Sequence, residues 1–240
     1  MEPEVSVVIP TFNEEHRIAQ TVNALRNIFS KHGINFEIIV SDGGSTDKTV
    51  LRVPKAKEVV VLKSPKFLPK GESLIIGGLK AKGRKIMFLD ADLPISADDI
   101  MRLINETGKN DLVIASRYHP KSKGKYPKIR FILGRLFNIY VRKMLKLRLY
   151  DTQSGAKCLS SEIARKTLGE IENKGYAFDV ELVLRVVKNR GRVKELPVQW
   201  EHKSGSRVKI LKVMLELFFG GYISDKTQSI VKELVQAIGW

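Results

Sequence analysis

Two carboxylates follow an apolar run in the segment KIMFLDADLP, residues 85–94. The four apolar residues 86–89 predict a short buried strand, and Asp90 and Asp92 come directly after it. In extended backbone, residues two apart point to the same side. Carboxylate oxygens suit Mg²⁺ or Mn²⁺, which bind a few carboxylates together with phosphate groups. Asp90 and Asp92 are therefore a candidate metal site. The alternative is a pair of solvated residues in the turn that ends the strand.

The elements that would position these carboxylates alternate between strand-like and helix-like segments. Ser96 is a suitable N-cap for the helix that follows the two carboxylates. The alternation predicts an α/β fold with a doubly wound, mostly parallel sheet. Short β-branched or apolar runs predict strands at residues 5–10, 36–40, 59–62, 86–89 and 111–115, and helices are expected at 15–31, 71–81 and 97–105.

Polar turns follow three of the predicted strands, at residues 10–14, 42–47 and 90–92. Ligands of open α/β sheets bind outside the carboxyl ends of the strands. Because parallel strands end at one edge of the sheet, the three turns are expected to form a single crevice. This convergence favours a ligand site over a solvated turn at Asp90 and Asp92.

The composition indicates a globular chain with an excess of positive charge. Its 240 residues can bury a sizeable core, and its formal charge of +16 predicts a polyanionic partner, such as nucleic acid, an anionic membrane surface or a phosphorylated substrate. The single cysteine, Cys158, cannot form an internal disulfide, which favours a reducing cytoplasm. No apolar run approaches the roughly 18 residues of a spanning helix, and the acidic start of the chain does not resemble a signal peptide.

The second half of the chain begins with a basic segment. Residues 121–150 contain ten Lys or Arg and no Asp or Glu, interleaved with apolar residues. This pattern predicts either a helix that contacts a membrane surface or an acidic ligand, or a solvated helix face packed on the sheet. A polar turn at 151–155, a strand at 156–159, helices at 161–168 and 176–188, and a strand at 193–198 are expected next. Cys158 falls in an apolar run without a paired histidine in view, so it is a poor candidate nucleophile.

The end of the chain predicts an amphipathic helical tail. Two apolar stripes in residues 208–240 are separated by Gly220 and Gly221. The expected division is a main domain at 1–207 and amphipathic helices at 208–240. The tail would pack on the domain, lie in a lipid interface or dimerise, and the first two are favoured.

Five segments occur in a fixed order: VVIPTFNEE, IIVSDGGSTD, FLDADLP, DTQSGAKCL and AFDVELV. A sixth, weaker one is Trp200 followed by the run GSR at 205–207. Together they resemble the family-two glycosyltransferases of the GT-A fold, a Rossmann-like fold that binds nucleotide sugars. The closest resemblance is to dolichyl-phosphate glucose and mannose synthases. The AFDVEL string looks more like the glucose branch, and Pro94 stands where the mannose branch commonly has glutamine.

The resemblance implies roles for individual residues. Asp90 and Asp92 would hold the divalent metal, Mg²⁺ or Mn²⁺, with the Ala91 backbone beside them. Arg117 and Arg130 would bind the acceptor phosphate, and with Asp92 they are the candidate catalytic residues. The candidate nucleotide-binding residues are Pro10, Phe12, Glu14, Val40, Asp42 and Lys70, together with Lys203 and Arg207, which match a mobile loop of the family only approximately.

The implied activity is metal-dependent, inverting transfer of a hexose from a nucleotide sugar to a polyprenyl phosphate. UDP-glucose is the favoured donor and GDP-mannose the alternative. A phosphate monoester is mostly dianionic at neutral pH, so it needs cationic side chains more than a general base. If a base is needed, Asp92, Asp151 and Asp179 are equal candidates. Transfer to a hydroxyl group of a soluble glycan or protein is a related possibility.

The expected location is the cytoplasmic face of a membrane, with peripheral association through the basic segment and the tail. A homodimer and a separate membrane subunit both remain open. The non-enzymatic alternative is a basic nucleic-acid-binding protein. Only the charge supports it, because no zinc, helix-turn-helix or RNA-recognition motif is present, so no nucleic-acid partner is expected.

Overall fold

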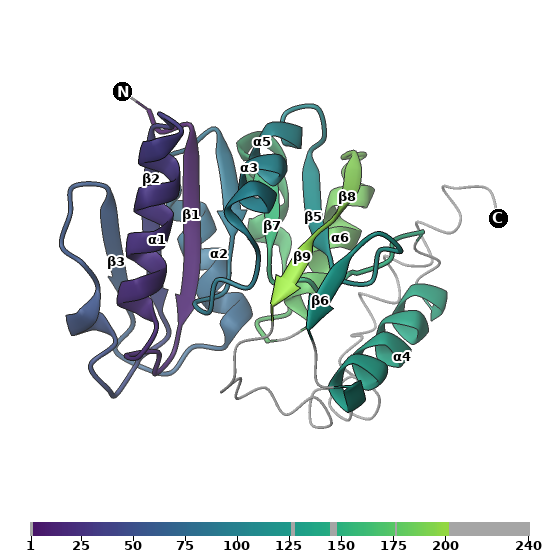
Figure 1. Cartoon of the computed structure of the whole chain (residues 1–240), viewed down its shortest axis with the longest axis horizontal. Helices are drawn as coiled ribbons and strands as arrows, with labels where there is room; N and C mark the ends of the chain where they lie inside the picture. Colours follow the sequence, from purple (N-terminus) through teal and green to yellow (C-terminus); the bar gives the residue numbers. More distant parts are fainter. Residues whose placement is uncertain (1, 126–127, 145–147, 176, 202–240) are drawn as a thin grey trace.

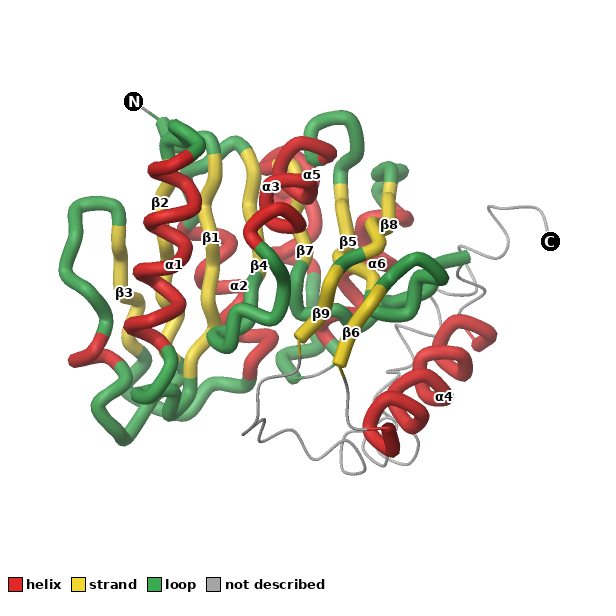
Figure 2. The backbone as a smooth tube through the Cα atoms, in the orientation of Figure 1, coloured by secondary structure: helices red, strands yellow, loops and turns green. Residues whose placement is uncertain are grey.

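The computed structural model describes residues 2–125, 128–144, 148–175 and 177–201 of the chain. A central sheet has the strand order β3-β2-β1-β4-β7-β5-β8, and helices cover both of its faces (Figures 1 and 2). A second, two-stranded sheet joins β6 to β9. The strands are β1 (Val5–Thr11), β2 (Phe36–Asp42), β3 (Val59–Lys63), β4 (Lys85–Phe88), β5 (Leu112–Ser116), β6 (Lys123–Lys125), β7 (Lys157–Ser160), β8 (Val193–Pro197) and β9 (Gln199–Glu201).

The helices separate into two layers and one outlying element. Helices α1 and α3 lie in front of the sheet in Figure 1, and α2, α5 and α6 lie behind it. The helices are α1 (Ile18–Lys31), α2 (Lys70–Lys80), α3 (Ala97–Glu106), α4 (Lys128–Met144), α5 (Ser161–Thr167) and α6 (Phe178–Lys188), with short 3-10 turns η1 (Val50–Arg52) and η2 (Leu168–Glu170). The predicted α/β class with a mostly parallel sheet is confirmed.

Successive residues of β1 face opposite sides of the sheet and so contact the two helical layers. Val7 faces the apolar cluster that contains α1 and α3, whereas the next residue, Val8, faces the cluster that contains α2, α5 and α6. Both side chains are fully buried. Strands covered on both faces are continuous apolar runs, which explains why the predictions for β1, β2, β4 and β5 agree closely with the structure. Strand β6, which lies in the basic segment, was not predicted.

Helix α1 begins three residues later than predicted. Asn13 has a left-handed φ of 57°, and its backbone N–H donates to Ser45 Oγ over 2.8 Å. The N–H of Glu14 donates to Thr49 Oγ1 over 2.7 Å. These contacts hold residues 12–15 in a turn against the loop that follows β2. In contrast, the predicted cap of α3 is confirmed, because Ser96 Oγ accepts the N–H of Asp99 over 3.1 Å.

Strand β7 runs opposite to the other strands of the central sheet, a direction that the sequence did not predict. It lies between β4 and β5 and runs antiparallel to both. The residues before β7, rather than those after it, therefore reach the edge at which β4 and β5 end. The polar turn at 151–155 consequently lies at the same edge as Asp90 and Asp92.

Helix α4 contains much of the basic segment and stands apart from the sheet (Figure 1). Ile132 and Leu136, one turn apart on α4, are 55% and 57% exposed. Asn138 is buried, and its Oδ1 accepts the Thr152 hydroxyl over 3.2 Å, so α4 is fastened to the turn before β7. The predicted tail at 208–240, and with it the domain boundary at 207, lies outside the described residues.

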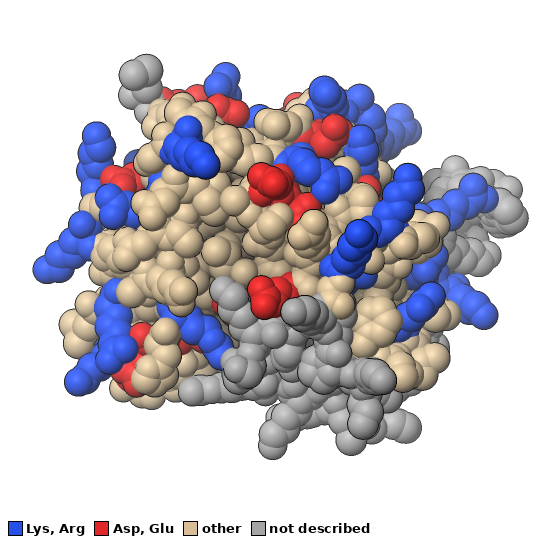
Figure 3. Space-filling view, viewed as in Figure 1, with Lys and Arg blue, Asp and Glu red and all other residues tan. Residues whose placement is uncertain are grey.

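Charged side chains are spread over the face of the molecule seen in Figure 3. Figure 3 shows Lys and Arg side chains distributed across the face of the molecule seen in Figure 1, with fewer acidic side chains between them. Among the helices of the described ranges, none combines the length and the apolar character needed to cross a bilayer.

Candidate active site

The loops after β1 and β2 meet at one edge of the sheet, as predicted. The Thr11 hydroxyl donates to Asp42 Oδ1 over 3.1 Å, and Asn13 Oδ1 accepts the N–H of Thr46 over 2.8 Å. Asp42 is 1% exposed and also accepts the N–H of Ser45 over 2.9 Å. Its carboxylate therefore organises the loop that follows β2.

The other predicted nucleotide-binding residues have different environments. Phe12 is 38% exposed, whereas the side chain of Val40 lies fully buried in the core of β2. The Glu14 carboxylate pairs with Arg17 over 2.9 Å. Pro10 lies near the end of β1. Their roles toward a nucleotide remain predictions.

The turn that contains Asp90 and Asp92 is fixed by its neighbours. The Thr21 hydroxyl of α1 donates to the Ala91 carbonyl over 2.6 Å, and the Leu93 N–H donates to the Asp90 carbonyl over 3.1 Å. Leu93 has a left-handed φ of 46°, which is costly for a residue with a Cβ. A strained backbone directly after two carboxylates is typical of a functional turn.

Asp90 is surrounded by cations. Lys70, the first residue of α2, forms an ion pair with Asp90 Oδ1 at 2.6 Å. Loss of hydration opposes ionisation of Asp90, but the positive charges of Lys70, Arg117 and Lys157 outweigh it and hold the pKa of this carboxyl below its usual value. The structure thus brings together the predicted residues Lys70 and Asp90.

The pKa of Asp92 is shifted in the opposite direction from that of Asp90. Burial and the neighbouring negative charge of Asp90 raise the pKa of Asp92 to about 6. Its Oδ1 atom is buried and has no hydrogen-bond partner within the part of the chain that the structure describes. A buried, unpaired carboxylate oxygen is unfavourable unless a further group binds it.

These two carboxylates fit a divalent cation. Both are hard oxygen donors, and an unsatisfied oxygen of Asp92 would gain a partner. In the described ranges no group of three or more His, Cys, Asp or Glu side chains could enclose a metal ion. Asp90 and Asp92 would therefore leave coordination positions for oxygens of a phosphorylated ligand.

Gly155, in the turn before β7, packs directly on Asp90. A Cβ atom at position 155 would overlap Asp90 Oδ2, so only glycine permits this approach. The turn thereby limits where the Asp90 carboxylate can lie.

We expect the Gly155→Ala substitution to weaken Mn²⁺ binding by about tenfold, because the new methyl group must displace the Asp90 carboxylate. The measurement is a titration followed by the electron paramagnetic resonance of free Mn²⁺. Gly169→Ala is the matched control, since a Cβ atom at position 169 would have no neighbour within 4 Å among the described residues. Equal Mn²⁺ affinity in Gly155→Ala and wild type would contradict the packing role of Gly155.

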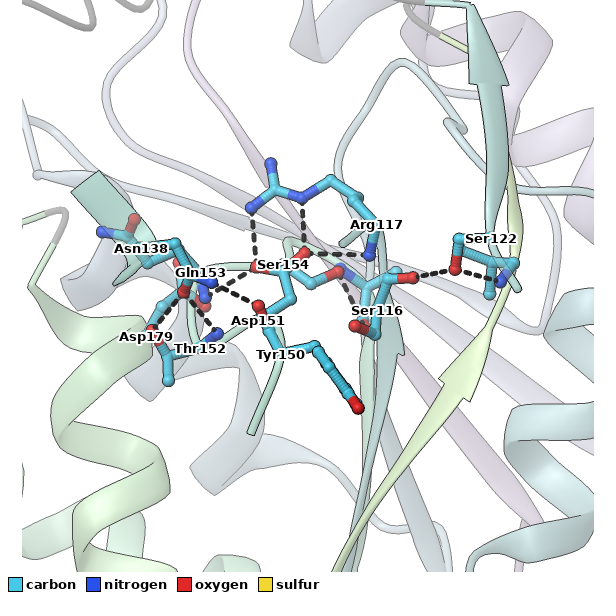
Figure 4. Close-up of polar contacts among 12 residues, drawn as sticks. Ser116, Arg117, Ser122, Asn138, Tyr150, Asp151, Thr152, Gln153, Ser154 and Asp179 are labelled. Atoms are coloured by element: carbon cyan, nitrogen blue, oxygen red, sulfur yellow. Dashed lines mark hydrogen bonds and ion pairs between the residues drawn. The ribbon is translucent and has the colours of Figure 1, made fainter. Parts of the chain in front are cut away.

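Arg117, after β5, is held rigidly at the same edge (Figure 4). Its Nε and Nη2 donate to the two oxygens of Asp151 over 2.7 and 2.9 Å, and the Asp151 side chain is fully buried. The guanidinium also lies 5.3 Å from the ring centroids of Tyr118 and Trp200. Glu195 of β8 accepts the N–H of Asp151 over 2.7 Å and so fixes this partner in turn.

The candidate bases differ in their surroundings. Asp151 is paired with Arg117, and Asp179 accepts a hydrogen bond of 2.6 Å from Lys157 Nζ. Asp92 carries the unpartnered oxygen described above. Cys158 is fully buried, and burial raises the pKa of its thiol to about 11, which agrees with the expectation that it is a poor nucleophile.

The remaining predicted site residues are Arg130, Lys203 and Arg207. Arg130 lies in α4. Lys203 and Arg207 fall outside the described residues.

Sequence reasoning missed three contributors to this edge. Lys157 appears as a charged residue in a strand, yet its side chain is 1% exposed and pairs with Asp179. Glu195 appears as an ordinary surface residue of β8, and Phe67 as part of a polar loop. Of the three, only Lys157 could have been identified from the sequence, because it lies within the segment DTQSGAKCL.

Comparison with known proteins agrees with this geometry. Residues 6–168 match the model of glycosyl transferase family 2. The chain is 27% identical to the glycosyltransferase AglD of Haloferax volcanii, covering 88% of this chain and 35% of AglD. It is 29% identical to the dolichyl-phosphate beta-glucosyltransferase of Saccharomyces cerevisiae, covering 86% of this chain and 69% of the yeast protein.

The fold is similar to that of solved structures. Glucosyl-3-phosphoglycerate synthase from Mycobacterium tuberculosis, solved with Mn²⁺, UDP and glucosyl-3-phosphoglycerate, aligns with a TM-score of 0.67 and 20% identity. The alignment covers 92% of this chain and 79% of that structure. The arrangement of loops around the carboxylate pair and the match over residues 6–168 lead to one assignment: the chain is an enzyme of glycosyl transferase family 2, with the GT-A fold.

Proposed function

We propose that this enzyme transfers glucose from UDP-glucose to a polyprenyl phosphate of the dolichyl type, with inversion at the anomeric carbon. The observation that carries the proposal is the meeting of a carboxylate pair, Asp90 and Asp92, with a rigidly held arginine, Arg117, at one sheet edge. The name of the yeast relative, dolichyl-phosphate beta-glucosyltransferase, supports the acceptor and the sugar.

Asp90 and Asp92 would hold Mg²⁺ or Mn²⁺; the solved mycobacterial neighbour contains Mn²⁺ with UDP. When bound, the divalent cation supplies positive charge next to the departing diphosphate. The residues of the chain provide the positioning. Thr21 and Gly155 hold the carboxylates in place, and Lys70 adds a positive charge at the same point.

Arg117 would receive the acceptor. Bidentate contact with Asp151 fixes the plane of the guanidinium, and the rings of Tyr118 and Trp200 flank it. A planar, preoriented cation suits a phosphate dianion, which needs orientation more than deprotonation. This geometry favours a phosphate acceptor over a hydroxyl acceptor, and Arg130 is proposed as a second contact.

Membrane association follows from the acceptor. We place the enzyme at the cytoplasmic surface of a membrane, where α4 would present Ile132, Leu136 and neighbouring basic residues to anionic lipids. A separate membrane subunit or a homodimer would be compatible with this location.

The test is a transfer assay with UDP-glucose or GDP-mannose, a short polyprenyl phosphate, and Mg²⁺ or Mn²⁺. Lipid-linked hexose is measured by mass spectrometry and its anomeric configuration by NMR. We expect transfer from UDP-glucose with inversion, and none to the corresponding polyprenol. Transfer only to soluble hydroxyl acceptors, preference for GDP-mannose or retention of configuration would each overturn the corresponding part of the proposal.

A further inference from the structure

Phe67 is a solvent-exposed aromatic ring beside the crevice. It lies in the loop 64–69 between β3 and α2 and is 62% exposed. Its ring meets that of Phe12 edge to face, with centroids 5.0 Å apart and an interplanar angle of 82°. Phe12 directly follows β1 and is itself 38% exposed. Two large apolar rings are thus displayed together at the carboxyl edge of the sheet.

The backbone holds Phe67 in this place. The Ser64 N–H donates to the Asp42 carbonyl over 3.0 Å, and the Leu68 N–H donates to the Gly43 carbonyl over 3.1 Å. Gly44 has a φ of 82°, and a Cβ there would lie 2.5 Å from the Lys66 carbonyl oxygen. The loop therefore lies directly against the turn after β2. These contacts hold the backbone of the loop. Exposed apolar side chains that lie together, as Phe67 and Phe12 do, rather than singly, mark ligand-binding surfaces.

The chemistry of the neighbours indicates the kind of ligand. Three residues after Phe67, Lys70 begins α2 and pairs with Asp90 at 2.6 Å. One short segment therefore supplies an aromatic face and then a cation at the carboxylate pair. A ligand with a flat heterocycle at one end and a diphosphate at the other matches both features.

We propose that Phe67 adds a second aromatic ring to the nucleobase subsite beside Phe12, which is already a candidate nucleotide-binding residue; this role of Phe67 rests on the proposed function. Aromatic rings bind bases through their faces, and such stacking typically contributes a fewfold to a hundredfold or more in affinity. Because every base has such a face, Phe67 contributes affinity for the nucleoside rather than choice between uracil and guanine.

The test compares binding of UDP, GDP and pyrophosphate, each with Mn²⁺, by isothermal titration calorimetry. We expect Phe67→Ala to weaken UDP and GDP binding by about tenfold and to leave pyrophosphate binding unchanged. Phe67→Tyr keeps the ring and should stay within about twofold of wild type. Phe67→Leu keeps apolar bulk without a ring and should resemble Phe67→Ala. Leu79→Ala, a similarly exposed apolar residue (52%) near the far end of α2, is the control.

Three results would overturn the inference. Unchanged nucleotide affinity in Phe67→Ala would mean that Phe67 does not contact the base. A parallel loss of pyrophosphate affinity would mean that the substitution distorts the loop around Lys70 instead. Full affinity in Phe67→Leu would mean that the ring face has no role. Failure of the proposed function is distinguishable, because wild-type protein would then bind neither UDP nor GDP.

Discussion

Asp92→Asn should reduce sugar transfer by at least about 100-fold, the loss typical when one electrostatic contact to the reacting group is removed. The amide keeps the shape of the side chain but presents one neutral oxygen and a hydrogen-bond donor in place of a carboxylate. Mn²⁺ affinity should fall together with transfer. Both are measured on the purified variant, with Asp98→Asn, an acidic residue in the first turn of α3, as the control.

The folding stability of Asp92→Asn should move in the opposite direction. The pKa of Asp92 is raised to about 6 by burial and by the charge of Asp90, so its ionised form is unfavourable in the folded, metal-free protein. A raised carboxyl pKa means that wild-type stability falls as the pH rises from about 4 through 6. At pH 7 and with chelator, the variant should therefore unfold at an equal or higher temperature than wild type. A destabilised variant at pH 7 would show instead that the carboxylate itself supports the fold.

The sequence determines much of the sheet because its strands are apolar on both faces. Residues such as Val7 and Val8 must both be buried, so the run itself predicts a central strand. The carboxylate pair could also be predicted, since Asp90 and Asp92 follow such a strand at fixed spacing. The local apolar pattern predicted the strands. The rule that ligands bind at the carboxyl ends of parallel strands then predicted the site at the carboxylate pair.

The orientation of β7 could not be predicted in the same way. A four-residue strand has the same apolar pattern in either direction, and its direction depends on pairing with β4 and β5. Trp200 stands out in the sequence only as part of a motif, yet its ring flanks Arg117 and its backbone bridges to Ile95 beside the carboxylate turn. These contacts join segments about a hundred residues apart, so no local sequence pattern predicts them.

Lys157 is the clearest example of a residue that the local pattern misrepresents. A lysine inside a short strand predicts a solvent-facing position, because charged residues are seldom fully buried. The structure buries it because α6 brings Asp179 to within 2.6 Å of its Nζ, and the Ser154 carbonyl accepts a second hydrogen bond. The pair therefore fastens the turn at 154–155, which packs on Asp90, to the first turn of α6.

We expect Lys157→Met to destabilise the fold by about 3–5 kcal/mol, because it leaves the Asp179 carboxylate buried without its cation. Urea unfolding measures the change. Lys166→Met is the matched control: Lys166 also pairs with an acid, Glu162, at 2.7 Å, but both side chains are more than half exposed, so a loss below about 1 kcal/mol is expected.

The double variant Lys157→Met/Asp179→Leu distinguishes the effect of the Lys157–Asp179 ion pair on folding stability from its effect on Mn²⁺ binding. Removing both charges leaves no buried ion unpaired at this position, so most of the lost stability should return. Mn²⁺ affinity should be reduced in Lys157→Met and in the double variant alike, because both lack the hydrogen bond from Lys157 to Ser154 that holds the turn against Asp90. Stability and metal binding that recover together would show that the ion pair serves the fold alone. If stability recovers but Mn²⁺ affinity stays low, Lys157 positions Asp90 for metal binding.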